Sequence, residues 1–237
     1  MTHVDLNLLA LDTSTDQLSV AVQRADGQRF AHTGAGGAQA SASLIPAVQA
    51  LLAQAGLSLS DLRAIAFGRG PGSFTGLRTA CSVAQGLAWG AGVPVLPIDT
   101  LLAVAEAARS AHGATHVLAL LDARMNEVYA AEYAWRDAAG WRPLSHIAVL
   151  APEAVPTPGA GAVLAGNAFA AYADRLPAAL QALPRIAALP SADALLNLAP
   201  ALLAAGAAVP AEQALPLYIR DKVAQTTAER SAAGLAR

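Results

Sequence analysis

A glycine-rich segment and two aspartates are the residues whose types and spacing could do chemistry. The segment FGRGPGSFTGLR, residues 67–78, places four glycines between an apolar run and a helical pattern. Glycine costs backbone entropy on folding, so glycines gather where a side chain would block a close approach. A helix start offers free N–H groups, which could bind a carboxylate or phosphate beside Arg69 or Arg78. The alternative is a tight turn that lets the helix pack closely on a sheet.

The two aspartates indicate an internal repeat. Asp12 and Asp122 each end an apolar run, and they lie 122 − 12 = 110 residues apart. A polar turn, an alternating strand and a further strand follow each of them, and the first copy continues as helix, strand, helix and strand. This pattern predicts two tandem α/β lobes, each a mixed five-stranded sheet with helices in the order βββαβα. The predicted domains are residues 1–108, 109–222 and a flexible tail, 223–237.

Three helices are predicted, and two of them contain a proline. The helical spacing in residues 41–56 predicts a helix with Ser43 as its cap, so that Pro46 falls in the first turn. A second helix follows the glycine-rich segment, over residues 75–90. A third begins at Ser191 and is expected to break near Pro200.

Composition excludes several classes of function. The chain has 237 residues, is 55% hydrophobic and carries a formal net charge of -2, with no basic run. Autonomous binding of nucleic acid needs clustered positive charge, which is missing here. The single cysteine excludes an internal disulfide and a cysteine-based metal cage. No export signal or membrane span is predicted, so we expect a cytoplasmic protein.

The motifs resemble those of a known family. The segments LALDTST, GRGPGSFTGLR, AQGLA, LDARMNEVYAAEY and PLYIR are together similar to the TsaB family, also called YeaZ, of bacterial tRNA threonylcarbamoyladenosine biosynthesis proteins. That family is a degenerate sister of TsaD in the actin-like ATPase superfamily. The resemblance implies a non-catalytic activator of a TsaD-type transferase, which modifies adenosine in tRNA. It also implies a TsaE-type ATPase and tRNA as indirect partners, and a homodimer when the chain is alone.

The chain departs from the superfamily at the sites that carry chemistry. TsaD-type enzymes hold a metal with a His-x-x-x-His pair on the first lobe's helix, and residues 41–56 contain no histidine, so no metal site is expected. His112 and His116 have that spacing, but Gly113 lies between them and indicates a turn. Actin-like ATPases bind phosphate with two hairpin turns, one per lobe and usually Asp-x-Gly, which we call the phosphate turns. Here Ser14 and Arg124 stand in place of the two glycines. No cofactor is expected, and weak contact with ATP or ADP stays open. The candidate remnant of an anion or nucleotide site is Asp12, Thr13, Arg69, Gly70, Gly72, Ser73, Thr75 and Arg78.

A protein surface is the favoured role for the first lobe's two helices. Apolar positions on the first helix cover a broader arc than one sheet contact needs, and small residues line the second. The resemblance implies that these helices bind TsaD or a second copy. The predicted interface is Leu44, Ile45, Val48, Leu51, Leu52, Gly76, Ala80 and Ala84. A charge at this surface, as in Val48→Glu or Ala84→Glu, is expected to abolish the complex and leave the chain folded.

Two other functions stay open on the sequence. An active actin-like ATPase or phosphotransferase would need the Asp12 turn to bind Mg-nucleotide. A metallopeptidase would need a metal pair, which the sequence does not supply.

Overall fold

The first sheet contains five strands and follows the predicted order. The computed structural model describes residues 6–137 and 139–220; the predicted tail, 223–237, lies outside them. The strands are β1 (Leu8–Asp12), β2 (Gln17–Gln23), β3 (Arg29–Ala35), β4 (Ala64–Gly70) and β5 (Val95–Asp99), in the spatial order β3-β2-β1-β4-β5. Strands β1 to β3 pair antiparallel, and β4 and β5 join in parallel. A helical crossover precedes each parallel strand, as parallel pairing requires.

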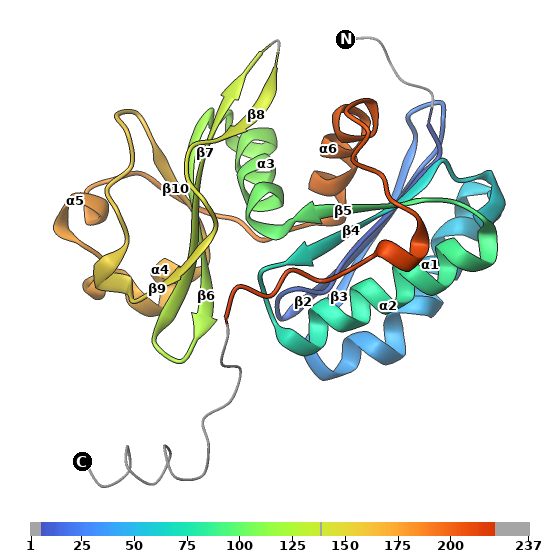
Figure 1. The fold of residues 1–237 in the computed structure, drawn as a ribbon, viewed down its shortest axis with the longest axis horizontal. Helices are drawn as coiled ribbons and strands as arrows, with labels where there is room; N and C mark the ends of the chain where they lie inside the picture. Colours follow the sequence, from blue (N-terminus) through green and yellow to red (C-terminus); the bar gives the residue numbers. More distant parts are fainter. Residues whose placement is uncertain (1–5, 138, 221–237) are drawn as a thin grey trace, which may run out of the picture.

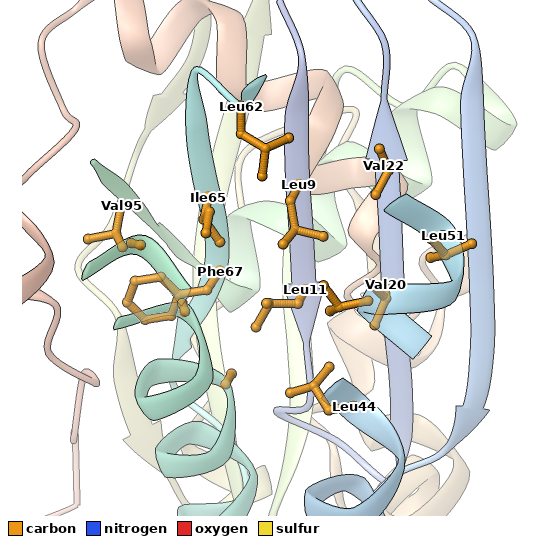
Figure 2. Close-up of a cluster of buried hydrophobic side chains, with 14 of the residues drawn as sticks. Leu9, Leu11, Val20, Val22, Leu44, Leu51, Leu62, Ile65, Phe67 and Val95 are labelled. Carbon is orange, nitrogen blue, oxygen red and sulfur yellow. The ribbon is translucent and has the colours of Figure 1, made fainter. Parts of the chain in front are cut away.

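Two helices cover one face of this sheet. They are α1 (Ala40–Ala55) and α2 (Phe74–Ala91). Figure 2 shows Leu44 and Leu51 of α1 close to strand side chains such as Leu11 and Val20, in one buried cluster. These side chains are buried, and removing apolar surface from water stabilises the lobe.

The second sheet repeats the topology of the first. Its strands are β6 (His116–Arg124), β7 (Glu127–Arg136), β8 (Gly140–Pro143), β9 (Ala148–Leu150), β10 (Val163–Gly166) and β11 (Arg185–Ala187). Their order is β11-β10-β6-β7-β8, and β9 also pairs with β7. Strands β8 and β9 pair with successive halves of β7, so together they occupy the place that β3 has in the first sheet. The predicted repeat is confirmed, with six strands in this sheet and not five.

Helix α3 (Thr100–His112) lies between the two sheets (Figure 1). Ala103 packs with the first sheet, while Leu101 and Val104 pack with Val117 of the second. Short helices α4 (Ala168–Tyr172) and α5 (Ala178–Gln181) cover the far face of the second sheet. The predicted boundary after residue 108 therefore falls inside a helix that both lobes share.

Helix α6 (Ala192–Ala204) corrects the predicted second domain. It packs against the first sheet, where Leu195 and Ala199 join Leu8 and Leu96 in one buried cluster. Residues 192–204 thus belong by packing to the first lobe, although they follow the second lobe in sequence. Helical periodicity shows that a segment has an apolar face, but not which sheet that face covers.

Pro46 and Pro200 both lie inside helices. Helix α1 begins at Ala40, so Pro46 lies beyond its first turn, and Ser43 Oγ donates to the carbonyl of Gln39 at 2.9 Å instead of capping the helix. The predicted cap at Ser43 is therefore wrong. Helix α6 continues through Pro200 to Ala204, so the predicted break is wrong too. Tertiary packing outweighs the missing N–H bond in both cases.

Candidate functional site

The glycine-rich segment packs against the turn between β1 and β2. A Cβ added to Gly76 would lie 1.8 Å from the backbone oxygen of Thr13, and one on Gly72 would lie 2.5 Å from that of Ser14. A Cβ on Gly68 would lie 1.8 Å from Asp12 Oδ2. Real Cβ atoms do not approach oxygen so closely. The close neighbour that these glycines admit is therefore the chain's own β1–β2 turn.

Leu217, near the C-terminal end of the described residues, packs against the other side of the glycine-rich loop. The Leu217 N–H donates to the carbonyl of Arg69 at 2.6 Å, and the Gly70 N–H donates to Thr100 Oγ1 at 3.1 Å. Gly70 has φ of 122°, and a Cβ there would lie 2.6 Å from the Leu217 oxygen. The loop is thus packed between residues 13–14 and residue 217, far apart in sequence.

Asp12 is buried at the centre of this packing. Its Oδ1 accepts hydrogen bonds from the backbone N–H and the hydroxyl of Ser14, at 2.9 and 2.7 Å. Its Oδ2 is buried, and no hydrogen-bond partner for it occurs among the described residues. Burial raises the pKa of the Asp12 carboxyl above its usual value, although the two bonds from Ser14 oppose the shift.

Asp12→Asn is expected to gain stability relative to the natural chain as the pH rises. The folded state holds the Asp12 proton to a higher pH than the unfolded state, so the free energy of unfolding falls as pH rises above about 4. Asparagine has no proton to lose, so urea midpoints of the two proteins should diverge between pH 4 and pH 7. Asp26→Asn, in an exposed turn, is the control. A constant difference between Asp12→Asn and the natural chain would contradict the buried, proton-holding carboxyl.

Most of the predicted anion-binding groups are engaged within the chain. Arg69 pairs with Asp99 at 2.6 Å. Arg78 lies 3.8 Å from the centre of the Phe74 ring and donates to the Tyr218 hydroxyl at 3.0 Å. The Ser73 N–H donates to the Ser14 oxygen at 2.7 Å, and Thr13 Oγ1 donates to that of Gly76 at 2.7 Å, while Thr75 is exposed. The structure brings Asp12, Thr13, Gly70, Gly72 and Ser73 together, but as internal packing.

The second predicted phosphate turn faces the first across a narrow cleft. Asp122 Oδ1 accepts from the Arg124 N–H at 2.7 Å and from the Tyr172 hydroxyl at 2.9 Å. Arg124 Nη2 reaches Asp16 Oδ2 of the first lobe at 2.5 Å. The space directly between the two turns is about 70 Å³, and Thr15, Asp16 and Asn167 at its edge also line a larger pocket of about 510 Å³. In this conformation Arg124 spans the cleft where a nucleotide phosphate would need room.

The predicted interface residues face inward, with one exception. Side chains or Cα atoms at seven of the eight positions are buried in the chain's own core: Leu44, Val48, Leu51, Leu52, Gly76, Ala80 and Ala84. Only Ile45 is exposed, at 42%. The broad apolar arc is used by the sheet and by contacts between the helices, so it cannot be a partner surface. Val48→Glu and Ala84→Glu would place a charge in the core and unfold the chain, contrary to the expectation above.

The exposed side of α1 and α2 carries almost no charge. Helix α1 contains no charged residue over 16 residues, and α2 contains only Arg78 over 18. We call the exposed side of the two helices the outward face: Ala42, Ile45, Gln49, Ala53, Thr75, Arg78, Ser82, Gly86, Trp89 and Gly90, with Arg78 as its one charged residue. Exposed helix surfaces normally carry several charges, so a face of mostly small and uncharged residues with a single charge is typical of an interface. The sequence alone shows that the two helices carry almost no charge, but the predicted interface consists mainly of apolar positions that are buried.

The described residues contain no group of three or more potential metal ligands. His116, expected in a turn, begins β6 and pairs with Glu132 at 2.6 Å. Within the described ranges, every helix is too short or too polar to cross a membrane.

Comparison with known proteins identifies the family. A family model described as TsaD, tRNA N6-adenosine threonylcarbamoyltransferase, matches residues 35–228. The tRNA threonylcarbamoyladenosine biosynthesis protein TsaB of Escherichia coli K12 is 39% identical, covering 92% of this chain and 96% of that protein. The chain belongs to the TsaB (YeaZ-type) family. The resemblance found in the sequence is thereby confirmed.

Solved structures agree with the fold of this family member. YeaZ from Pseudomonas aeruginosa superposes with a TM-score of 0.83 at 42% identity, covering 90% of this chain and 99% of that one. A second structure from the same organism has a TM-score of 0.84 at 42% identity and covers 91% and 100%. It is described as an uncharacterized protein with similarity to peptidase YEAZ.

Proposed function

We propose that this TsaB-type chain acts in the formation of N6-threonylcarbamoyladenosine on tRNA as a non-catalytic partner of a TsaD-type transferase. The outward face of α1 and α2, which carries Arg78 as its one charge, is the observation that carries this proposal. The family assignment supplies the pathway, and the face supplies a means of association. The same face would pair two copies when the partner is absent, because a two-fold contact uses one surface twice.

An accessory role fits the chemistry of the two phosphate turns. The space between them is about 70 Å³, Arg124 is paired with Asp16 across it, and the Asp12 carboxylate is buried. Because it is buried, Asp12 is not placed to hold a hydrated metal ion at an open site. We therefore expect the chain to lack ATPase activity of its own, and any contact with ATP or ADP to be weak.

A peptidase activity has less support. A metal-dependent peptidase needs a cluster of ligands, and the described part of the chain has no such group of three. The wording of one neighbour's description is the only observation that favours it. The proposed setting is cytoplasmic, with a TsaE-type ATPase and tRNA reached through the TsaD-type partner.

A reconstituted modification assay tests the proposal. It contains the TsaD-type enzyme, its threonylcarbamoyl donor, a TsaE-type ATPase and tRNA, with or without this chain, and counts modified adenosine. We expect little modification without the chain and none from the chain alone. The partner's active conformation would gain population on binding, since a ligand that prefers one state shifts the equilibrium to it.

Two results would contradict the proposal. Modification at the same rate without the chain would show that the chain is not needed. Nucleotide turnover by the isolated chain that is lost in Asp12→Ala would favour the ATPase alternative. Size-exclusion chromatography of the chain with the TsaD-type protein separates failure to bind from failure to activate.

A further inference from the structure

A second candidate binding site lies at the junction of the two lobes. A cavity of about 210 Å³ opens between the start of α2, the β6–β7 turn and residues 217–220. Phe74, Leu77, Met125 and Tyr218 contribute much of its apolar lining. The Phe74 and Tyr218 rings are 5.3 Å apart between centroids. Since an apolar cavity of about 150 Å³ can hold benzene, this one has room for a single large apolar side chain.

Both charged residues that line the cavity are arginines, and a third arginine beside the cavity is uncompensated. Arg124 and Arg220 line the cavity, and no carboxylate does. These two arginines are already paired, with Asp16 and Glu127. Arg78 lies against Phe74 and Tyr218 beside the cavity, and no acidic partner for it occurs among the described residues. Its guanidinium carries five N–H donors, and the bond from Nε to the Tyr218 hydroxyl is the one side-chain bond it makes within the described ranges.

The turn that forms one wall has an unusual backbone. Arg124, Met125 and Asn126 all have positive φ, at 60°, 55° and 62°. A left-handed conformation is unfavourable for a long side chain such as methionine, and such positions concentrate at functional sites. This turn leaves the Met125 side chain 49% exposed at the cavity. Methionine adapts its shape to a bound group, which suits it to a binding wall.

We propose that this cavity receives one large apolar side chain of a partner protein, with an adjacent carboxylate of that partner bonding to Arg78. The volume matches one side chain, and the uncompensated guanidinium selects an acidic neighbour. Nucleic acid is disfavoured because the other two arginines are neutralised and the whole chain carries a net charge of -2. The proposal adds a contact site next to the outward face, where α2 begins.

Methionine-methyl NMR on the full chain tests the proposal. The sequence has two methionines, Met1 and Met125, so ¹³C-methyl labelling gives a reporter at the cavity and one far along the chain. The probe is the capped dipeptide N-acetyl-Phe-Glu-amide, and the Met125 signal should shift saturably as the phenyl ring enters. The matched N-acetyl-Phe-Gln-amide should bind at least about fivefold more weakly, because it lacks the charge that Arg78 meets.

Matched variants assign the effect to Arg78. Arg78→Gln should bind both peptides equally weakly, whereas Arg142→Gln, an exposed arginine on β8, should behave as the natural chain does. No saturable shift at about 10 mM peptide, which bounds the affinity, would overturn the proposal. Equal binding of the two peptides by the natural chain would overturn it as well. So would a short oligoadenylate that shifts Met125 more strongly than the peptide and loses this effect in Arg78→Gln.

Discussion

Ile45→Glu is expected to weaken the complex with the TsaD-type protein by about 100-fold or more while leaving the chain folded. Ile45 is the one predicted interface residue that is exposed, and it lies on the outward face of α1. If that face is buried against a partner, the new carboxylate loses water without gaining an opposite charge. Such an unpaired buried charge costs about 3–5 kcal/mol, and each 1.4 kcal/mol is about tenfold in affinity. Isothermal titration calorimetry measures the loss.

Leu144→Glu is the matched control for Ile45→Glu. Leu144 is 46% exposed, close to the 42% of Ile45, but it follows β8 in the second lobe. Both variants should keep the thermal midpoint of the natural chain within a few degrees, because neither side chain is part of the core. Equal affinity of Ile45→Glu and the natural chain would place the partner surface elsewhere. Equal weakening by Leu144→Glu would show a non-specific effect of charge.

Gly76→Ala is expected to prevent stable folding. The added Cβ would lie 1.8 Å from the Thr13 backbone oxygen, and both residues are buried. The helix would have to leave the β1–β2 turn, which would also break the bond from Thr13 Oγ1 to the Gly76 oxygen. We expect the free energy of unfolding to fall by more than about 4 kcal/mol. This is a large part of the roughly 5–15 kcal/mol that stabilises a folded domain. Urea unfolding followed by circular dichroism measures it.

The same substitution elsewhere in α2 should have the opposite sign. A Cβ on Gly90 would meet no atom within 4 Å. Gly90→Ala should therefore stabilise the chain by about 0.5–1 kcal/mol, because alanine loses less backbone entropy in a helix. Gly76→Ala can be measured in the Gly90→Ala background if it is too unstable alone. An unchanged urea midpoint in Gly76→Ala would mean that the helix and the turn are not in close contact.

Much of the fold could be predicted because its signals are local. The apolar run before Asp12 and the alternation after it indicate strands, and the same pattern at Asp122 indicates the repeat. The third strand of the second lobe was harder to place, because it is divided into β8 and β9. The predicted cap at Ser43 and the predicted break near Pro200 are wrong, because proline is unfavourable in a helix locally and only the packing of α1 and α6 tolerates it.

The sequence by itself determined the repeated α/β lobes, the family and the fact that something approaches residues 67–78 closely. Only the tertiary structure decided what approaches: the backbone at Thr13 and Ser14 on one side and Leu217 on the other. It also decided which side of α1 is free, with Val48 inward and Ile45 outward, and that α6 returns to the first sheet. Periodicity along the chain shows that one face of a helix or strand is apolar. The surface that covers this face is set by contacts between residues far apart in sequence, which periodicity does not show.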